Sequence, residues 1–291
     1  MRDTDYRYAN RIFVSILNDS NQYKSVIRVF VKSVIHLFTI LLILRFFKTL
    51  FGIYALLISV VNLLLHAPLA VVIFTTFPKK TKLKYAHRIA RSWAGTYQLF
   101  LFMPFRIRNK EYIDPNRTYV FVANHRSQLD IPLYLRAAKN TAKFLAKAEL
   151  LKIPLFGYVL KTMYITVNRE ERADRNKSIE IMKRTLDEGV SVFLCPEGTR
   201  NKKKDPPLLD FRDGAFRLAI STQTPVAVFT VLNTGDKLSP VRPAELAPGA
   251  IYGVWDKPIE TKGMTMDDVP ALRDRVRTMM IAHLKEFRSS K

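Results

Sequence analysis

Apolar residues are distributed in two different ways along the chain, and the change falls near residue 105. Before it, the apolar residues form long runs, of which 29–47 and Thr49–Phe77 are the most continuous. After it, short apolar runs alternate with stretches of helical period. Long apolar runs are typical of membrane helices, whereas short runs alternating with helical stretches are typical of an α/β domain.

The run Thr49–Phe77 is the strongest candidate for a membrane helix, because it carries no formal charge and a spanning helix takes about 20 residues. Pro68 is expected to break it about two thirds of the way along. Lysines and arginines flank the run on both sides, which does not fit a single crossing under the positive-inside rule. We expect residues 33–77 to cross twice, to form a re-entrant helical pair, or to lie partly in one leaflet.

Residues 83–103 continue with helical period, and their aromatic and basic residues are typical of a helix at a membrane interface. Pro104 is expected to end this helix. The pattern predicts two regions. Residues 1–104 are expected to form an N-terminal membrane-associated helical region, and residues 105–291 an α/β domain.

The alternation after residue 105 predicts a mostly parallel sheet with helices on its faces. The expected strands are residues 118–123, 142–146, 163–167, 191–194 and 226–232. The expected helices are residues 130–138, 154–161, 174–188, 212–221 and 267–287, the last opened by a capping box at Thr265–Asp268. The predicted fold class is α/β, a mostly parallel sheet flanked by helices and preceded by an N-terminal hydrophobic helical membrane anchor.

The charge of the chain narrows the choice of partner. The formal net charge is +22, and no acidic residue occurs from Ser20 to Lys110. Basic residues bracket the apolar runs there, which favours anionic lipid headgroups over a nucleic acid, and the uncharged run Thr49–Phe77 also argues against a nucleic-acid binder. The single cysteine, Cys195, excludes an intrachain disulfide and is expected to be a small packing residue rather than a nucleophile.

A histidine and an aspartate follow the strand expected at residues 118–123. The apolar run ends in Asn124 and His125, and Asp130 falls near the first turn of the next helix. Ligands of open α/β sheets bind at such strand ends, and a carboxylate one turn away can fix the tautomer of a histidine that acts as a general base. The spacing alone is weak evidence, because Asp130 would serve equally well as a helix cap.

Two other expected strands also end in polar residues. The strand at 191–194 is followed by an acceptor, a permissive glycine, a hydroxyl and a bidentate donor, namely Glu197, Gly198, Thr199 and Arg200. The strand at 163–167 is followed by Arg169. Such arginines suit a phosphate or carboxylate, although each alone is more often part of a surface ion pair. The three strand ends form one site if their strands are neighbours.

These stretches resemble the conserved blocks of the glycerolipid acyltransferases of the 1-acylglycerol-3-phosphate acyltransferase type. Asn124–Asp130 resembles the His-x4-Asp block, and Pro196–Arg200 resembles the third block. Residues 147–157 followed by Tyr164–Arg169 are similar to the second. Thr224–Val228 resembles the fourth, but the family often has a proline where this chain has Val228, which affects the expected donor preference. The resemblance covers about residues 105–260.

The resemblance implies a reaction and a role for each residue. His125 would be the general base for the free hydroxyl of lysophosphatidate, and Asp130 would orient it. The hydroxyl would attack an acyl thioester directly, and coenzyme A or acyl carrier protein would leave as the thiol, giving phosphatidate for phospholipid biosynthesis. No metal and no cofactor beyond this co-substrate is implied. The glycerol phosphate would be held by Arg169, Glu197, Gly198, Thr199 and Arg200.

Other interpretations of the sequence remain open. The acceptor could be another lysolipid, either a lyso-aminolipid or a lysophospholipid. The chain could also be a catalytically silent membrane-binding module, although intact His125 and Asp130 argue against that. The expected partners are membrane lipids, lysophosphatidate and acyl-CoA or acyl carrier protein, with no nucleic acid. The expected location is a membrane, with the active site facing the cytoplasm.

Overall fold

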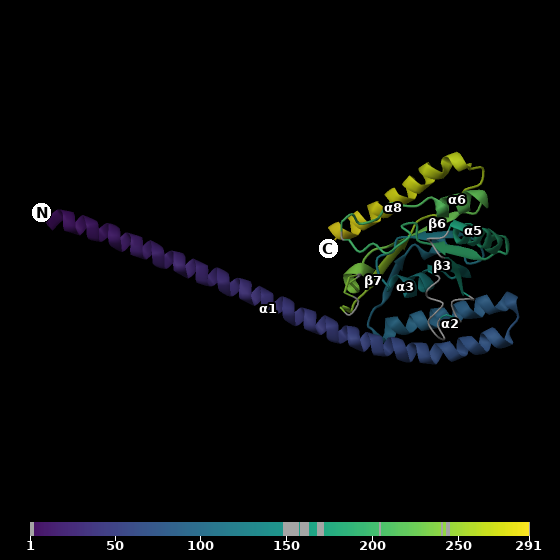
Figure 1. Cartoon of the computed structure of the whole chain (residues 1–291), viewed down its shortest axis with the longest axis horizontal. Coiled ribbons are helices and arrows are strands. Elements are labelled where there is room, and N and C mark those ends of the chain that lie inside the picture. Colours follow the sequence, from purple (N-terminus) through teal and green to yellow (C-terminus); the bar gives the residue numbers. More distant parts are fainter. Residues whose placement is uncertain are drawn as a thin grey trace. The chain divides into compact units, whose positions relative to one another are not determined.

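A seven-stranded sheet organises the part of the chain that follows residue 105 (Figure 1). The computed structural model describes residues 3–147, 157, 163–167, 172–203, 205–239, 241–242 and 245–290. The chain divides into two compact units, Met1–Leu50 and Phe51–Lys291. The first unit is helical throughout its described residues, and the second contains the sheet with the helices that cover it.

The strand order of the sheet is β1-β7-β6-β2-β5-β3-β4. Strands β6, β2, β5, β3 and β4 run parallel to one another, β7 runs antiparallel to β6, and β1 is parallel to β7. The strands are β1 (Phe105–Arg108), β2 (Val120–Ala123), β3 (Ala142–Lys147), β4 (Tyr164–Val167), β5 (Ser191–Leu194), β6 (Val226–Val231) and β7 (Ile251–Trp255). The predicted mostly parallel sheet is confirmed, and each of the five expected strands is present.

Strands β1 and β7 were not expected from the sequence. The run Phe105–Arg108 alternates apolar with basic residues over only four positions, and Gly253 interrupts the apolar pattern of β7. Strand β1 pairs with β7, where Ile107 lies opposite Gly253, and β7 also pairs with β6. Such pairing joins residues far apart in the chain and leaves little trace in the local pattern.

Four of the five expected helices are present. The helices are α1 (Asp3–Thr76), α2 (Lys79–Phe100), α3 (Asp130–Ala137), α5 (Arg172–Asp187), α6 (Gly214–Ser221), α7 (Thr234–Lys237) and α8 (Val269–Ser289), with 3-10 turns at Lys110–Tyr112 and Met266–Asp268. The helix expected at 154–161 lies outside the described residues apart from Gly157. The capping box is confirmed, because the amide of Thr265 donates to Asp268 Oδ2 at 2.7 Å.

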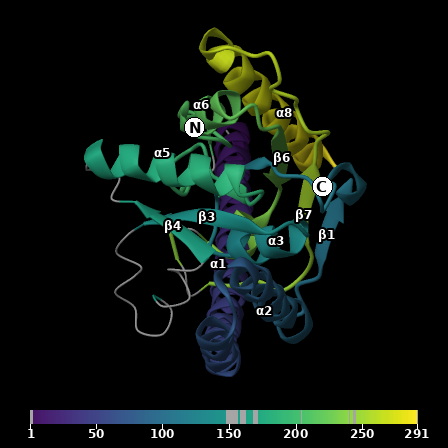
Figure 2. The same cartoon turned by 90° about the vertical axis from the view of Figure 1, so that its right-hand side faces the viewer.

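Alternating side chains of the strands build two apolar layers, one on each face of the sheet. In β2, Phe121 and Ala123 join the layer that contains residues of α2 and α3, whereas Val120 and Val122 join the layer that contains residues of α5, α6 and α8. Figures 1 and 2 show these two groups of helices on opposite faces of the sheet. The central strands are therefore buried on both sides, as in other parallel sheets.

Helix α1 does not break at Pro68, and this expectation from the sequence was wrong. The helix continues through Pro68 to Thr76, and the chain then turns into α2. A proline removes one backbone donor, but packing on both sides of it can hold the helix together. Ala67, Ala70 and Phe74 are buried around this point. The side chain of Asn62 also donates to the Trp93 carbonyl of α2 at 3.0 Å.

The segment Lys24–Thr76 of α1 is long and apolar enough to cross a membrane by length and composition. Its most apolar 18-residue stretch has a mean hydropathy of 2.4, and most large apolar side chains of the segment are exposed. The helix is continuous from residue 33 to Thr76, so the expected helical pair within residues 33–77 was wrong, because the chain turns only after Thr76. The placement of this helix in a membrane stays a prediction. The presence of a long apolar N-terminal helix agrees with the expected anchor.

Gly253 offers a test of the packing between β6 and β7. A Cβ atom at this position would lie 2.8 Å from Cε2 of Phe229, whose fully buried ring packs on Trp255 with centroids 4.6 Å apart. We expect Gly253→Ala to lower the free energy of unfolding by about 1–3 kcal/mol, because the ring has no room to move. Chemical denaturation measures this, with Gly214→Ala as the control, since a Cβ at Gly214 meets nothing within 4 Å. Equal stability of the two variants would contradict this packing.

Candidate active site

His125 and Asp130 form a hydrogen-bonded pair at the carboxyl end of β2. The strand ends at Ala123, and α3 begins at Asp130, so the six-residue connection returns the carboxylate to the histidine. His125 Nδ1 lies 2.7 Å from Asp130 Oδ2. With the hydrogen on Nδ1, the lone pair of Nε2 is free to accept a proton. The His125 side chain is 21% exposed and that of Asp130 is fully buried, so only the histidine can reach a ligand.

Several donors compensate the buried charge of Asp130. Its Oδ2 atom accepts hydrogen bonds from the backbone amides of Arg126 at 2.7 Å and Ser127 at 2.8 Å, in addition to the bond from His125. Its Oδ1 atom accepts a hydrogen bond from the hydroxyl of Thr234. A buried carboxylate persists in its ionised form only with this kind of compensation. The same donors fix the plane of the carboxylate and so the orientation of the imidazole.

Glu197 supports the backbone of the histidine turn. One carboxylate oxygen accepts the His125 amide at 2.8 Å, and the other accepts the Leu209 amide at 2.8 Å. The side chain is buried, and this burial raises the pKa of Glu197 even though the two amides act in the opposite direction. Both oxygens of Glu197 are therefore committed to the protein backbone, which gives this residue a positioning role that the sequence had not indicated.

The turn after β5 adjoins the histidine turn because β5 pairs directly with β2. The Asn201 amide donates to the His125 carbonyl at 2.8 Å and ties the two turns together. Gly198 has φ +70°, which favours glycine, and a Cβ there would lie 2.8 Å from Nε of Arg212. Thr199 is exposed and Arg200 is half-buried at this edge. The structure thus brings His125 and the turn at 197–200 to one place.

Arg169 lies outside the described residues. The strand before it, β4, ends at Val167 and is the edge strand of the sheet, with β5 and β3 between it and β2. Neighbouring strands lie about 4.8 Å apart, so β4 lies about 14 Å from β2. The strand ends of β2 and β5 are neighbours as expected, but that of β4 is not adjacent to them. A contribution of Arg169 to the site stays a prediction.

Three residues of this region were missed or left without a role by the sequence pattern. Asn124 joins β2 to β6, because its side chain donates to the Val231 carbonyl at 2.9 Å and accepts the Val231 amide at 2.7 Å. The hydroxyl of the buried Tyr134 donates to the Asn124 carbonyl. Thr234 reaches Asp130 from the turn after β6. The sequence offers one hint, namely that the polar residues Asn233 and Thr234 follow a strand end.

Cys195 and the His, Cys, Asp and Glu side chains of this region bear on two further expectations, a packing role for the cysteine and a reaction without a metal. Cys195 is half-buried against the core, and its Sγ lies 3.8 Å from the Tyr134 hydroxyl, which agrees with a packing residue. Among the described residues, no group of three or more His, Cys, Asp or Glu side chains is arranged to hold a metal ion. The expectation of a reaction without a metal stays a prediction.

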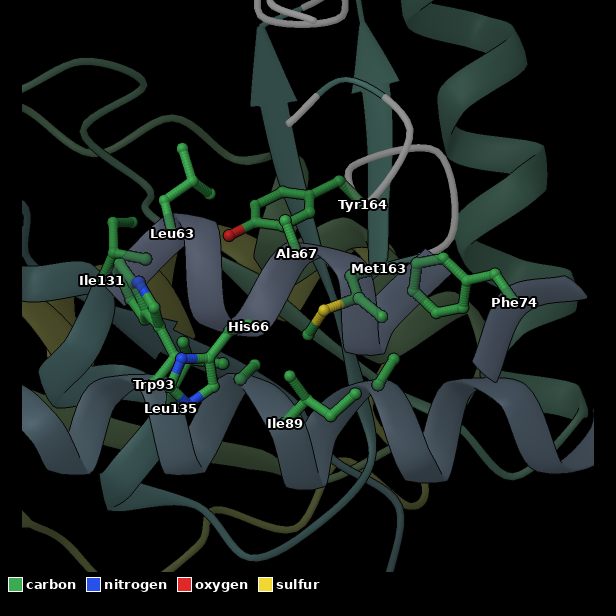
Figure 3. Close-up of a pocket in the computed structure, with 13 residues that line it drawn as sticks. Leu63, His66, Ala67, Phe74, Ile89, Trp93, Ile131, Leu135, Met163 and Tyr164 are labelled. Atoms are coloured by element: carbon green, nitrogen blue, oxygen red, sulfur yellow. The ribbon is translucent and has the colours of Figure 1, made fainter. Parts of the chain in front are cut away.

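An apolar cavity of ≈ 110 Å³ lies beside α3 (Figure 3). Helix α3 begins with Asp130, and its next residue, Ile131, is part of the cavity wall together with Leu135. Side chains of α1, α2 and the start of β4 complete the wall, among them Phe74, Trp93 and Tyr164. The cavity thus shares helix α3 with Asp130, and its apolar lining suits a hydrocarbon chain.

Comparison with known proteins finds similarity to acyltransferases in this region. Residues 104–231 match the family model described as Acyltransferase. The chain is 29% identical over 200 residues to the uncharacterized acyltransferase C1851.02 of Schizosaccharomyces pombe, covering 68% of this chain and 71% of that protein. It is 31% identical over 183 residues to the 1-acyl-sn-glycerol-3-phosphate acyltransferase alpha of Mus musculus, covering 62% of this chain and 64% of the mouse protein.

A solved structure has the same fold. The crystal structure of the 1-acyl-sn-glycerophosphate acyltransferase PlsC from Thermotoga maritima superposes with a TM-score of 0.69 and 24% identity. The match covers 84% of this chain and 96% of that chain. It therefore includes helices that precede the sheet as well as the sheet itself.

The backbone contacts of Glu197 predict a stability effect. Glu197→Gln keeps the shape of the side chain but replaces one acceptor oxygen by an amide that cannot accept from Leu209 or His125. Hydrogen bonds to a charged group contribute about 1.5–3 kcal/mol, so we expect a loss of that size in the free energy of unfolding. Denaturant titration measures it, and Glu180→Gln on exposed α5, which loses only a surface ion pair with Lys183, is the control. Unchanged stability of Glu197→Gln would exclude the positioning role.

Proposed function

We propose that the chain is an acyltransferase that transfers an acyl chain from an acyl thioester to the free hydroxyl of lysophosphatidate, giving phosphatidate. The observation that supports this most directly is the His125–Asp130 pair, which lies within the matched region and leaves one ring nitrogen exposed. The names of the relatives support the choice of acceptor.

The proposed chemistry uses one base and no covalent enzyme intermediate. Nε2 of His125 accepts the proton of the lysolipid hydroxyl while the hydroxyl oxygen attacks the thioester carbon. Asp130 stabilises the imidazolium that forms and keeps the ring oriented. The carbon–sulfur bond then breaks, and the imidazolium returns its proton to the departing thiolate. The products are a new oxygen ester and a free thiol, so atoms and charges balance.

We place the glycerol phosphate of the acceptor against the turn that follows β5. Arg200 and Thr199 offer a charged donor and a hydroxyl at the edge that carries His125, and Gly198 lets the backbone approach closely. Arg169 is proposed as a further phosphate ligand. Glu197 acts here through the backbone of His125 rather than by touching the phosphate.

We place an acyl chain in the apolar cavity beside α3 (Figure 3). The cavity shares α3 with Asp130, and a chain held there would place its reactive end toward His125. The reaction then takes place beside a membrane that supplies the lysolipid, with the site on the cytoplasmic side, where acyl-CoA or acyl carrier protein is available. No cofactor beyond this co-substrate is required by the proposed chemistry.

Removing the base tests the proposed reaction. We expect His125→Ala to lower acyl transfer by about 10²–10⁴-fold, the usual contribution of a general base. The measurement is transfer of a labelled acyl group from a thioester to a panel of lysolipids by purified membranes. The matched control is His283→Ala, because His283 forms a second His–Asp pair with Asp256, with Nε2 and Oδ1 2.9 Å apart, outside the proposed site.

The panel of acceptors separates the alternatives. Transfer to lysophosphatidate that is lost in His125→Ala and retained in His283→Ala supports the proposal. Transfer only to a different lysolipid would retain the mechanism and change the substrate. No transfer to any acceptor by folded, membrane-bound wild-type protein would favour a silent membrane-binding module.

Filling the cavity tests the proposed place of the acyl chain. Ala70 is buried in the cavity wall, and Ala70→Leu would shorten the space available to a hydrocarbon chain. We expect transfer of long acyl chains to fall by about 10-fold relative to short ones, since each excluded methylene is worth about 0.8 kcal/mol. Competition between thioesters of different chain length measures this. Leu69→Phe, on the exposed side of the same helix, is the control, and an unchanged preference in Ala70→Leu would place the chain elsewhere.

A further inference from the structure

Thr234 is a buried hydroxyl directed at the carboxylate of the His–Asp pair. Its side chain is fully buried and donates a hydrogen bond to Oδ1 of Asp130. The other carboxylate oxygen, Oδ2, accepts the bonds from His125, Arg126 and Ser127. Among the described residues, Thr234 is therefore the donor that occupies the side of the carboxylate facing away from the histidine.

The turn that carries Thr234 is itself held rigidly. Asn233, the preceding residue, donates from its side chain to the Ala250 carbonyl at 2.9 Å and accepts the Tyr252 amide at 2.9 Å. The strand before this turn, β6, is hydrogen-bonded to β2 along its length and tied again to it by Asn124. The hydroxyl of Thr234 is thus presented to Asp130 from a third strand end with little freedom to move.

The hydroxyl is not explained by the helix that Thr234 begins. Helix α7 spans only Thr234–Lys237, and no side-chain hydrogen bond caps its start. A buried hydroxyl needs a partner, and here the partner is the carboxylate that orients the base. The arrangement is that of an outer-shell residue that orients a functional group through a second side chain.

We propose that Thr234 is a positioning residue for the His125–Asp130 pair, acting through Oδ1 of Asp130. The proposal rests on the proposed function, because it assigns Thr234 to the base of that reaction. The hydroxyl holds the carboxylate in the plane that His125 Nδ1 requires, and it shares the negative charge of a group that water does not reach. Without it, Oδ1 would be a buried acceptor of a charged group with one partner missing.

Loss of the hydroxyl has a predictable sign. A donor to Oδ1 stabilises the negative carboxylate whether or not His125 is protonated. When the Thr234 hydroxyl is removed, the charge of the Asp130 carboxylate is less compensated and attracts the imidazolium more strongly. The protonated form of His125 is therefore favoured. The neutral base then forms at higher pH, and the acid limb of the pH–rate profile moves upward. A residue that only fills space would leave this limb in place.

Other ionisable groups around the pair stay constant in the comparison. They come from the histidine turn, from α3, from β5 and its turn, from α7 and from α8. They are Arg126, Tyr134, Cys195, Glu197, Asp236 and Arg288. None of them is altered by a substitution at Thr234, so a change in the pH profile reports the lost hydroxyl.

The test compares Thr234→Val, which removes the hydroxyl at nearly constant shape, with Thr234→Ser, which keeps it. We expect Thr234→Val to lower kcat about 10- to 100-fold, the usual range for an outer-shell partner, with little change in KM for the acceptor. Its acid limb should move to higher pH, and Thr234→Ser should restore both values. Purified full-length protein in membranes is assayed with acyl thioester and lysophosphatidate over a range of pH.

The matched control is Thr230→Val in β6, the strand that precedes the turn carrying Thr234. The hydroxyl of Thr230 is buried with no hydrogen-bond partner in the described part of the chain, so its removal should change neither kcat nor the pH profile. Equal losses in both valine variants, or an unchanged acid limb in Thr234→Val, would overturn the proposal.

A readout without substrate separates this proposal from the proposed function. In ¹⁵N-histidine protein, the pH midpoint of the His125 imidazole signal should be higher in Thr234→Val than in wild type, Thr234→Ser and Thr230→Val. A wild type that transfers no acyl group, together with this displaced midpoint, would reject the proposed function and retain the contact. An equal midpoint in all four proteins would reject the role of Thr234. If Thr234→Val does not fold, Thr234→Ala takes its place in both measurements.

Discussion

The buried carboxylate of Asp130 is the constraint on which the rest of the site depends. A charge without access to water is stable only when its lone pairs are matched by donors, and here the donors come from several parts of the chain. The histidine turn supplies two backbone amides and the imidazole, and the turn after β6 supplies a hydroxyl. The positions of β2, α3 and β6 relative to one another are thus coupled to the chemistry of His125.

The parallel core of the sheet makes this convergence possible. Strands β6, β2 and β5 lie side by side with their carboxyl ends at one edge, so three turns far apart in the chain meet there. Asn124 joins the turn after β2 to the end of β6. Glu197, in the turn after β5, accepts hydrogen bonds from the amides of His125 and Leu209, and so joins the turns after β5 and β2. These bonds hold the backbone around His125, whose side chain is 21% exposed at this edge.

The block Pro196–Arg200 divides into a buried part and an accessible part. Glu197 is buried and bound to the backbone, whereas Thr199 is exposed and Arg200 is half-buried. Gly198 separates the two parts with a positive φ that reverses the chain between them. The short block therefore supports the backbone of His125 through Glu197 while Thr199 and Arg200 stay accessible.

The sequence by itself determined the features that depend on nearby residues. Apolar runs located the five parallel strands, and Thr265 and Asp268 located the start of the last helix. The spacing of His125 and Asp130 located the pair, because a short connection from a strand end to the next helix suffices to bring them together. Only the tertiary structure decided which strand ends are neighbours. It separated β4 from β2, paired β1 with β7, carried α1 through Pro68, and brought Thr234 to a carboxylate 104 positions earlier. Hydrogen bonds between distant segments follow from sheet order and packing, and local periodicity carries no record of either.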